Sequence, residues 1–244
     1  MSSTQRQPSG ARPPGEEARA RVPLVRPRAV IFDMDGTLLD TETVALRAWV
    51  EAAAAAGVAF DEAVGRAVIG KNFADSSAHM RRHFHGTDYP VDAVLGRFHA
   101  TFDALTKREG VTVKDGAREL LSALRDAGIP AAVATSTRRE RAREKLDHAG
   151  LLASFVAVVG GDDVTRGKPA PDIYLAAAAA LATDPPHCLA IEDSEPGFRA
   201  AHAAGMTTIL VPDIATPSAE LLALQPRIVH SLAEVRALFH AHAG

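Results

Sequence analysis

Two aspartates, Asp33 and Asp35, follow directly on a short apolar run at residues 29–32. Two carboxylates so close together at the end of a buried strand are costly to bring together unless a positive charge compensates them. Gly36 follows the pair and lets the chain turn sharply there. Because ligands of open parallel sheets bind outside the carboxyl ends of the strands, we expect both aspartates to face an active-site crevice.

Three further polar clusters end later segments of the same kind. They are Thr135-Ser136-Thr137 after the run 131–134, Lys168 in the loop Gly-Lys-Pro-Ala-Pro-Asp, and Glu192-Asp193 after the run 189–191. Hydroxyl and N–H groups at a strand-to-helix junction can bind an anion. The lysine lies between Gly and Pro, so it extends from a loop with a rigid backbone.

Together the four clusters supply the groups that phosphoryl chemistry requires. Carboxylate oxygens are the ligands that Mg²⁺ prefers. The candidate metal ligands are Asp33, Asp35, Glu192 and Asp193. Thr135 and Lys168 can hold a phosphate, and ionised Asp33 can act as a nucleophile. Since a carboxylate repels a phosphate dianion, the attack needs a cation and a lysine beside it.

The elements that must position these residues alternate between strands and helices. Strands are predicted at residues 29–32, 129–134, 155–159, 187–191 and 207–211, and helices at 117–127, 138–149, 172–182 and 196–204. Gly128, Gly150 and Gly205 each follow a helix, as C′ glycines do. This pattern predicts an α/β fold, a doubly wound, Rossmann-like parallel sheet covered on both faces.

The stretch between the first two strands has helical periodicity and no clear strand. Helices are predicted at residues 43–56, 61–69, 74–84 and 91–108. We interpret residues 43–111 as a helical cap inserted into a catalytic core of residues 29–42 and 112–244. Residues 1–28 hold six arginines, two glutamates and few aliphatic side chains. Such a segment buries too little apolar surface to offset its ordering entropy, so a disordered tail is predicted.

The composition excludes several classes of protein. The 244 residues include 27 basic and 30 acidic side chains, a net charge of −3 that gives no reason to expect nucleic acid or a membrane as partner. No apolar run reaches the roughly 18 residues of a membrane span. The single cysteine, Cys188, excludes an internal disulfide framework. The N-terminal residues lack the apolar segment of a secretory signal, so a cytoplasmic location is expected, and no protein partner is predicted.

In order and spacing, the four clusters resemble the motifs of the haloacid dehalogenase-like (HAD) hydrolase superfamily. Its first motif is similar to residues 33–42, DMDGTLLDTE, and the others are similar to Thr135, to Lys168 in GKPAPD and to residues 192–197, EDSEPG. The resemblance covers about residues 29 to 215. It is closest to the branch of beta-phosphoglucomutase and the small sugar-phosphate phosphatases, and it implies a type I cap formed by a helical bundle.

The resemblance implies a role for both aspartates of the first motif. Asp33 would be the nucleophile that forms an aspartyl-phosphate. Asp35 would protonate the leaving alcohol and then activate water. The dehalogenases that name the superfamily lack this second acid, and the ion-pumping ATPases have a threonine there. An aspartate at this position therefore implies rapid turnover of the phosphoenzyme.

The other matched residues would hold the metal and the phosphoryl group. In this family the main-chain carbonyl of Asp35 and the side chain of Asp193 ligate Mg²⁺, with Glu192 a ligand or a partner of the ligands. Thr135 would bind the phosphoryl group, and Lys168 would neutralise its charge and steady the nucleophile. Further substrate contacts are expected from Gly36, Thr41, Ser136, Thr137, Arg138, Lys71 and Asn72. Thr41 lies at the hinge of the cap, whose closure would exclude water.

These roles favour a phosphatase that acts on a small phosphorylated metabolite, with sugar phosphates as the expected substrates. A beta-phosphoglucomutase-type mutase is the alternative, since it shares the motifs. Mutases carry a cap histidine and a cap arginine where this chain has Ala45 and Phe73, which disfavours that alternative, although Arg138 could contact a distal phosphate. A catalytically silent binding or regulatory protein is the alternative of another class.

Overall fold

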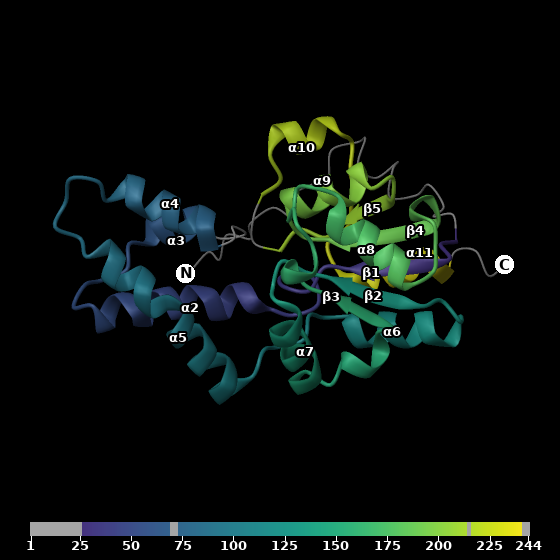
Figure 1. Cartoon of the computed structure of the whole chain (residues 1–244), viewed down its shortest axis with the longest axis horizontal. Coiled ribbons are helices and arrows are strands. Elements are labelled where there is room, and N and C mark those ends of the chain that lie inside the picture. Colours follow the sequence, from purple (N-terminus) through teal and green to yellow (C-terminus); the bar gives the residue numbers. More distant parts are fainter. Residues whose placement is uncertain (1–25, 69–72, 214–215, 241–244) are drawn as a thin grey trace, which may run out of the picture.

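Six parallel strands form one sheet in the computed structural model, which describes residues 26–68, 73–213 and 216–240 (Figure 1). The strands are β1 (Ala29–Phe32), β2 (Ala131–Ala134), β3 (Ala157–Val159), β4 (Cys188–Glu192), β5 (Thr207–Leu210) and β6 (Arg227–Ile228). Their order across the sheet is β3-β2-β1-β4-β5-β6. This is the order of doubly wound dinucleotide-binding sheets, in which the chain reverses direction on either side of the first strand.

Two apolar layers cover the sheet, one on each face. Successive strand residues point to opposite faces, so Val30 and Phe32 enter one layer while Ala29 and Ile31 enter the other. Helices α6 (Ala117–Asp126), α7 (Arg139–His148) and α11 (Leu232–His240) pack on the first face. Helices α8 (Asp172–Ala180) and α9 (Glu195–Ala203) pack on the second, where many core residues are alanines.

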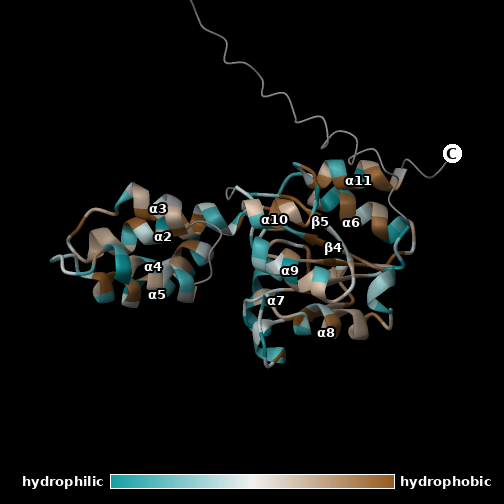
Figure 2. Cartoon of the chain, turned by 90° about the horizontal axis from the view of Figure 1, so that it is seen from above, coloured by the Kyte–Doolittle hydropathy of each residue, from teal (hydrophilic) through white to brown (hydrophobic). Residues whose placement is uncertain are grey.

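Four of the five described helices between β1 and β2 form a separate group with a core of its own. They are α2 (Thr41–Ala55), α3 (Glu62–Val68), α4 (Phe73–His83) and α5 (Val91–Glu109), and we call them the helical insert. Trp49, Phe98 and Met80 are buried at its centre, and the indole of Trp49 stacks on the ring of Phe98 at 3.8 Å. The insert lies beside the carboxyl ends of the strands (Figures 1 and 2).

The structure confirms the predicted parallel sheet covered on both faces. Gly128, Gly150 and Gly205 follow their helices with φ of 68°, 66° and 80°, the left-handed conformation that a C′ glycine adopts. The predicted strands at 129–134 and 155–159 are shorter in the structure, where they begin at Ala131 and Ala157; Ile129 and Phe155 pack against the core ahead of these strands.

The sequence did not predict the last elements of the described chain, α10 (Ala219–Ala223), β6 and α11. It also did not predict the 3₁₀ helices η1 (Leu152–Ser154), η2 (Gly161–Asp163) and η3 (Pro185–His187). A strand of two residues or a helix of five is too short to show a period, and such elements form through tertiary contacts. Most of the predicted tail lies outside the described residues. Within the described ranges, the helices are all too short or too polar to cross a membrane.

Candidate active site

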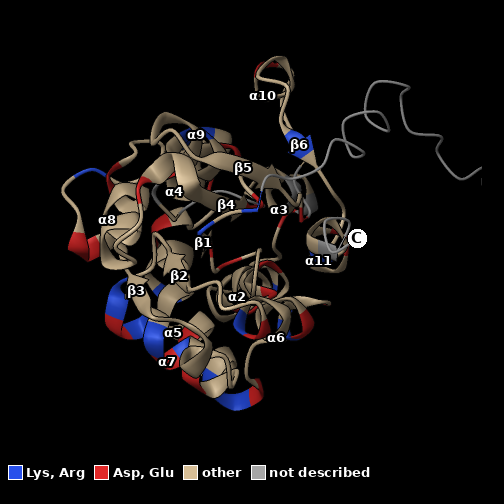
Figure 3. Ribbon diagram, turned by 90° about the vertical axis from the view of Figure 1, so that its right-hand side faces the viewer, with Lys and Arg blue, Asp and Glu red and all other residues tan. Residues whose placement is uncertain are grey.

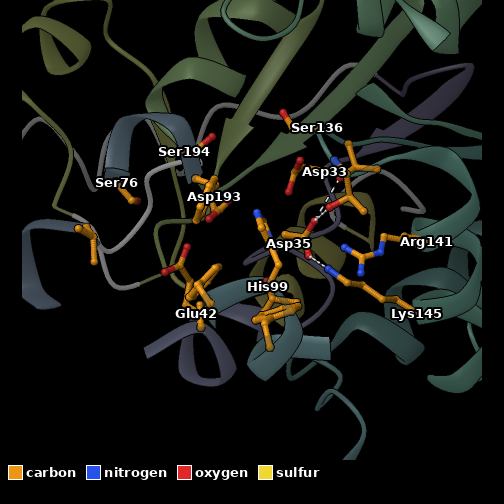
Figure 4. Close-up of a pocket in the computed structure, with 18 of the residues that line it drawn as sticks. Asp33, Asp35, Glu42, Ser76, His99, Ser136, Arg141, Lys145, Asp193 and Ser194 are labelled. Atoms are coloured by element: carbon orange, nitrogen blue, oxygen red, sulfur yellow. Dashed lines mark hydrogen bonds and ion pairs between the residues drawn. The ribbon is translucent and has the colours of Figure 1, made fainter. Parts of the chain in front are cut away.

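The loops after β1, β2 and β4 meet at the carboxyl edge of the sheet. The strand order reverses between β1 and β4, the place where open α/β sheets bind their ligands. A cavity of about 560 Å³ lies there, between this edge and the helical insert (Figure 4). From the core it is lined by Asp33, Asp35, Thr135, Ser136, Thr137, Arg138, Arg141, Lys145, Lys168, Asp193, Ser194 and Pro196.

Three of the predicted acidic residues form one buried cluster. Each of Asp33, Glu192 and Asp193 offers an oxygen that lies within 4.8 Å of the others. The ammonium of Lys168 donates to Oδ1 of Asp33 and to Oε1 of Glu192, both at 2.5 Å. Its side chain is 6% exposed, so the ion pairs are shielded from water.

The electrostatics of this cluster show a shortage of positive charge. Burial, together with Glu192 and Asp35, raises the pKa of Asp33 to about 8 in spite of the neighbouring Lys168. Burial and the charges of Asp33 and Glu192 also raise the pKa of Asp193. Although burial lowers the pKa of an ammonium, the same carboxylates raise that of Lys168. One lysine therefore does not compensate three carboxylates, and the cluster favours a further cation.

Glu192 is fully buried and uses both of its oxygens inside the protein. Oε1 accepts from Lys168 and from the hydroxyl of Tyr174 at 2.7 Å. Oε2 accepts from the backbone N–H groups of Asp193 and Ser194, and from Oγ of Ser194. The side chain of Glu192 therefore fixes both the loop after β4 and the position of Lys168. Tyr174 was not predicted as part of the site, because a tyrosine at helical spacing in α8 is indistinguishable from a core residue.

The absence of a side chain at Gly197 leaves space for the carboxylate of Glu192. A Cβ at this position would lie 1.7 Å from Oε1 of Glu192, and the glycine does not need a positive φ. We expect Gly197→Ala to displace the Glu192 side chain and to lower the free energy of unfolding by about 1–3 kcal/mol, as overpacking does. Gly96→Ala in α5 is the control, because nothing lies within 4 Å of its Cβ. Equal denaturation midpoints for the two variants would contradict the expectation.

Asp35 lies in a different environment from Asp33. Its Oδ2 accepts from the hydroxyls of Thr137 at 2.7 Å and Thr135 at 3.2 Å, and its Oδ1 accepts from the ammonium of Lys145 at 2.9 Å (Figure 4). Burial raises the pKa of Asp35, but the charge and hydrogen bond of Lys145 and the two hydroxyls outweigh it, so the pKa lies below its usual value.

The turn after β1 brings the first motif against the last. Gly36 adopts a φ of 90°, and its Cα lies so close to Asp193 that a Cβ would be 2.2 Å from Oδ2. Thr37 donates to Oδ1 of Asp193 at 3.2 Å. Thr41 is buried, lines the cavity and begins α2. Gly36 thus acts through close packing rather than by presenting a side chain.

The remaining predicted contact residues differ in their positions. Ser136 lines the cavity, and Arg138 lies at its rim, 79% exposed, with Nε 3.9 Å from Asp162. Lys71 and Asn72 lie outside the described residues. The insert contributes mainly apolar side chains to the cavity wall: Ala45, Leu46, Trp49, Val68, Phe73, Phe98 and Phe102, together with Thr41, Glu42, Ser76 and His99.

Among the polar cavity residues that the sequence reasoning missed are Lys145 and Arg141 of α7 and His99 of α5. Arg141 forms an ion pair with Asp103 of α5, so the contact joins the core to the insert. No motif marks these residues, because α7 carries many charges (Figure 3) and only its orientation shows which of them face the cavity.

The donor set fits a hard divalent cation. Asp33 and Asp193 each place a carboxylate oxygen in the cluster, and burial together with the neighbouring carboxylates raises the pKa of each. Oxygen donors without His or Cys suit Mg²⁺ better than a transition metal. Around the cluster, the buried carboxylates, the lysine and the hydroxyls together form a site that can bind a phosphate and exchange a proton with it.

Comparisons with known proteins show the family to which the chain is similar. Residues 27–205 match the family model described as haloacid dehalogenase-like hydrolase. Hexitol phosphatase A of Escherichia coli is 36% identical over 187 residues, which cover 77% of this chain and 84% of that protein. A bifunctional riboflavin kinase/FMN phosphatase of Arabidopsis thaliana is 31% identical over 210 residues, 85% of this chain; the chain spans about half (54%) of that relative's length.

A solved structure shows the same fold. A HAD family hydrolase from Deinococcus radiodurans, crystallised with bound phosphate and sodium, superposes with a TM-score of 0.74 at 34% identity. The superposition covers 88% of this chain and 96% of that one.

Proposed function

Since this chain belongs to the haloacid dehalogenase-like hydrolases, whose relatives here include named phosphatases, we propose that it is a Mg²⁺-dependent phosphatase of a small phosphorylated metabolite. The observation that carries the proposal is the contrast between two carboxylates of one turn. Asp33 contacts Lys168 and the acidic cluster, whereas Asp35 contacts hydroxyls and Lys145. Two carboxylates in different environments are suited to two different roles.

In the first half of the reaction, Asp33 is the nucleophile. A carboxylate oxygen of Asp33 attacks phosphorus, and the bond from phosphorus to the ester oxygen breaks. The negatively charged phosphate, once bound beside Asp35, favours the protonated form of this side chain. Asp35 then gives that proton to the ester oxygen, which leaves as an alcohol. Lys168, already 2.5 Å from Asp33, neutralises the charge that would otherwise repel the phosphate. The hydroxyl of Thr135 and the adjacent backbone hold the phosphoryl oxygens.

In the second half, water displaces the Asp33 carboxylate from phosphorus. Asp35, now a carboxylate, takes a proton from water as its oxygen attacks the aspartyl-phosphate. The bond from phosphorus to Asp33 breaks, inorganic phosphate leaves and both aspartates return to their starting states. The hydrogen bonds from Thr137 and Lys145 stabilise the carboxylate form of Asp35 that this step needs.

Asp33, Asp193 and the main-chain carbonyl of Asp35 would hold the metal. When bound, Mg²⁺ supplies positive charge that offsets the phosphate and the carboxylates around it. Thr37 and Gly36 keep Asp193 directed toward Asp33, and Glu192 supports the loop without a free oxygen of its own.

A sugar or polyol phosphate fits the cavity best. The insert covers the site with aromatic and aliphatic side chains that can pack on the C–H face of a sugar. Hydroxyl and charged groups lie on the core side, where the phosphate is expected. The hexitol phosphatase relative is named for a substrate of this class. In this proposal residues 43–111 act as the cap that closes over the substrate.

The mutase alternative finds less support. A mutase must hold a second phosphate with its cap, yet Ala45 and Phe73 line the cavity at the two positions concerned. Among the described residues of the insert that line the cavity, neither lysine nor arginine occurs.

A panel of phosphorylated metabolites tests the proposed function. The protein should release inorganic phosphate from at least one sugar or polyol phosphate in the presence of Mg²⁺, and a chelator should abolish the release until Mg²⁺ is restored. Isothermal titration should show Mg²⁺ binding to the wild type and weaker binding to Asp193→Asn. Isomerisation of a hexose phosphate without phosphate release would favour the mutase, and silence with every substrate would favour a binding protein.

A further inference from the structure

Lys145 belongs to none of the four motifs, yet it contacts the proposed acid directly. It extends from the second turn of α7 into the cavity, where its side chain is 13% exposed. Its ammonium lies 2.9 Å from Oδ1 of Asp35 (Figure 4). Among the described residues, Lys145 is the cation that forms an ion pair with Asp35.

The two oxygens of Asp35 face groups with different hydrogen-bonding capacity. Oδ1 faces an ammonium, which donates but has no lone pair to accept with. Oδ2 faces the hydroxyls of Thr135 and Thr137, which can donate or accept. A proton on Asp35 therefore fits on Oδ2 and not on Oδ1. Lys145 thus determines which oxygen of Asp35 can carry the proton.

The helical insert covers Lys145 from the other side. The ammonium lies 5.0 Å from the centroid of the Phe102 ring of α5, within the range of a cation–π contact. One turn earlier on α7, Arg141 pairs with Asp103 of the same helix α5. The position of Lys145 therefore depends on the place of α5 against α7.

We propose that Lys145 is a positioning residue for proton transfer in the reaction assigned above, an inference that rests on the proposed function. It donates to Oδ1 and so directs Oδ2 of Asp35 toward the oxygen of the leaving group. The proton passes from Oδ2 to that oxygen as the bond to phosphorus breaks, and Lys145 keeps all of its own protons. Phe102 holds Lys145 in this position while α5 covers the cavity.

Two esters of similar size test the proposal, because only one needs the proton. The nitrophenolate of p-nitrophenyl phosphate leaves unprotonated, whereas the alkoxide of benzyl phosphate must be protonated. Lys145→Met should lower kcat/KM for benzyl phosphate about 10–100-fold, because it removes part of the contribution of the general acid. The same substitution should lower kcat/KM for p-nitrophenyl phosphate less than about 3-fold. Lys145→Arg, which keeps a donor, should recover much of the loss.

Arg143→Gln is the matched control, since Arg143 is an exposed cation of the same helix. It should leave both values unchanged. If Lys145→Met does not fold by circular dichroism, Phe102→Leu takes its place and should show the same selective loss at smaller size. Equal losses on the two esters, or no loss on benzyl phosphate, would overturn the proposal while the phosphatase assignment stands. A wild-type protein that cleaves neither ester with Mg²⁺ would overturn both.

Discussion

An Asp33→Asn protein is expected to lose phosphatase activity by at least about 10⁴-fold, which is the size of the loss in kcat when a catalytic nucleophile is removed. The amide keeps the volume of the carboxyl group and can still accept from Lys168, but it cannot attack phosphorus. Removal of one charge from an overcharged cluster should leave the unfolding midpoint equal to that of the wild type or higher. Initial rates with Mg²⁺ and a thermal melt measure both effects.

A trapped intermediate would identify the same residue chemically. Asp35→Asn lacks the base that activates water, so its phosphoenzyme should accumulate when p-nitrophenyl phosphate supplies a leaving group that needs no proton. Mass spectrometry of the digested protein should find the phosphoryl group on the peptide with Asp33. Asp126→Asn, at an exposed position far from the cavity, is the control for the loss of a carboxylate. Turnover retained by Asp33→Asn, or a phosphoryl group on another residue, would contradict the assignment.

Lys168→Met is expected to have the largest effect on stability. The ammonium compensates Asp33 and Glu192 in a place that water does not reach. Removal of one partner from a buried ion pair leaves an uncompensated charge and costs about 3–5 kcal/mol. Activity should fall about 10²–10³-fold, as it does when a group that stabilises the transition-state charge is lost. Urea denaturation and steady-state rates measure the two losses.

The double variant Lys168→Met/Asp33→Asn separates charge from packing. If uncompensated carboxylates cause the instability, the second substitution should restore part of the free energy of unfolding, which a double-mutant cycle measures. Lys107→Met, an exposed lysine of α5, should behave as the wild type. An unchanged denaturation midpoint for Lys168→Met would show that this ammonium does not balance the cluster.

The fold was predictable because its signals are local. Aliphatic runs such as residues 29–32, and glycines such as Gly128 with φ of 68°, report on the conformation of their own segment. β6 and α10 gave no such signal, since each is too short for a period and forms only against its neighbours. The bounds of the cap and the roles of the motif residues stay predictions that the experiments above test.

The sequence by itself determined the four strand-end clusters, because polar residues that interrupt apolar runs stand out at any position in a chain. It also placed them at one edge of a parallel sheet. Only the tertiary structure decided that Lys145 reaches Asp35, that Tyr174 supports Glu192 and that Phe102 covers the ammonium. These partners are 110, 18 and 43 residues apart in the chain. They meet because α7, α8 and α5 are each oriented with one face toward the site, and no local sequence pattern encodes that orientation.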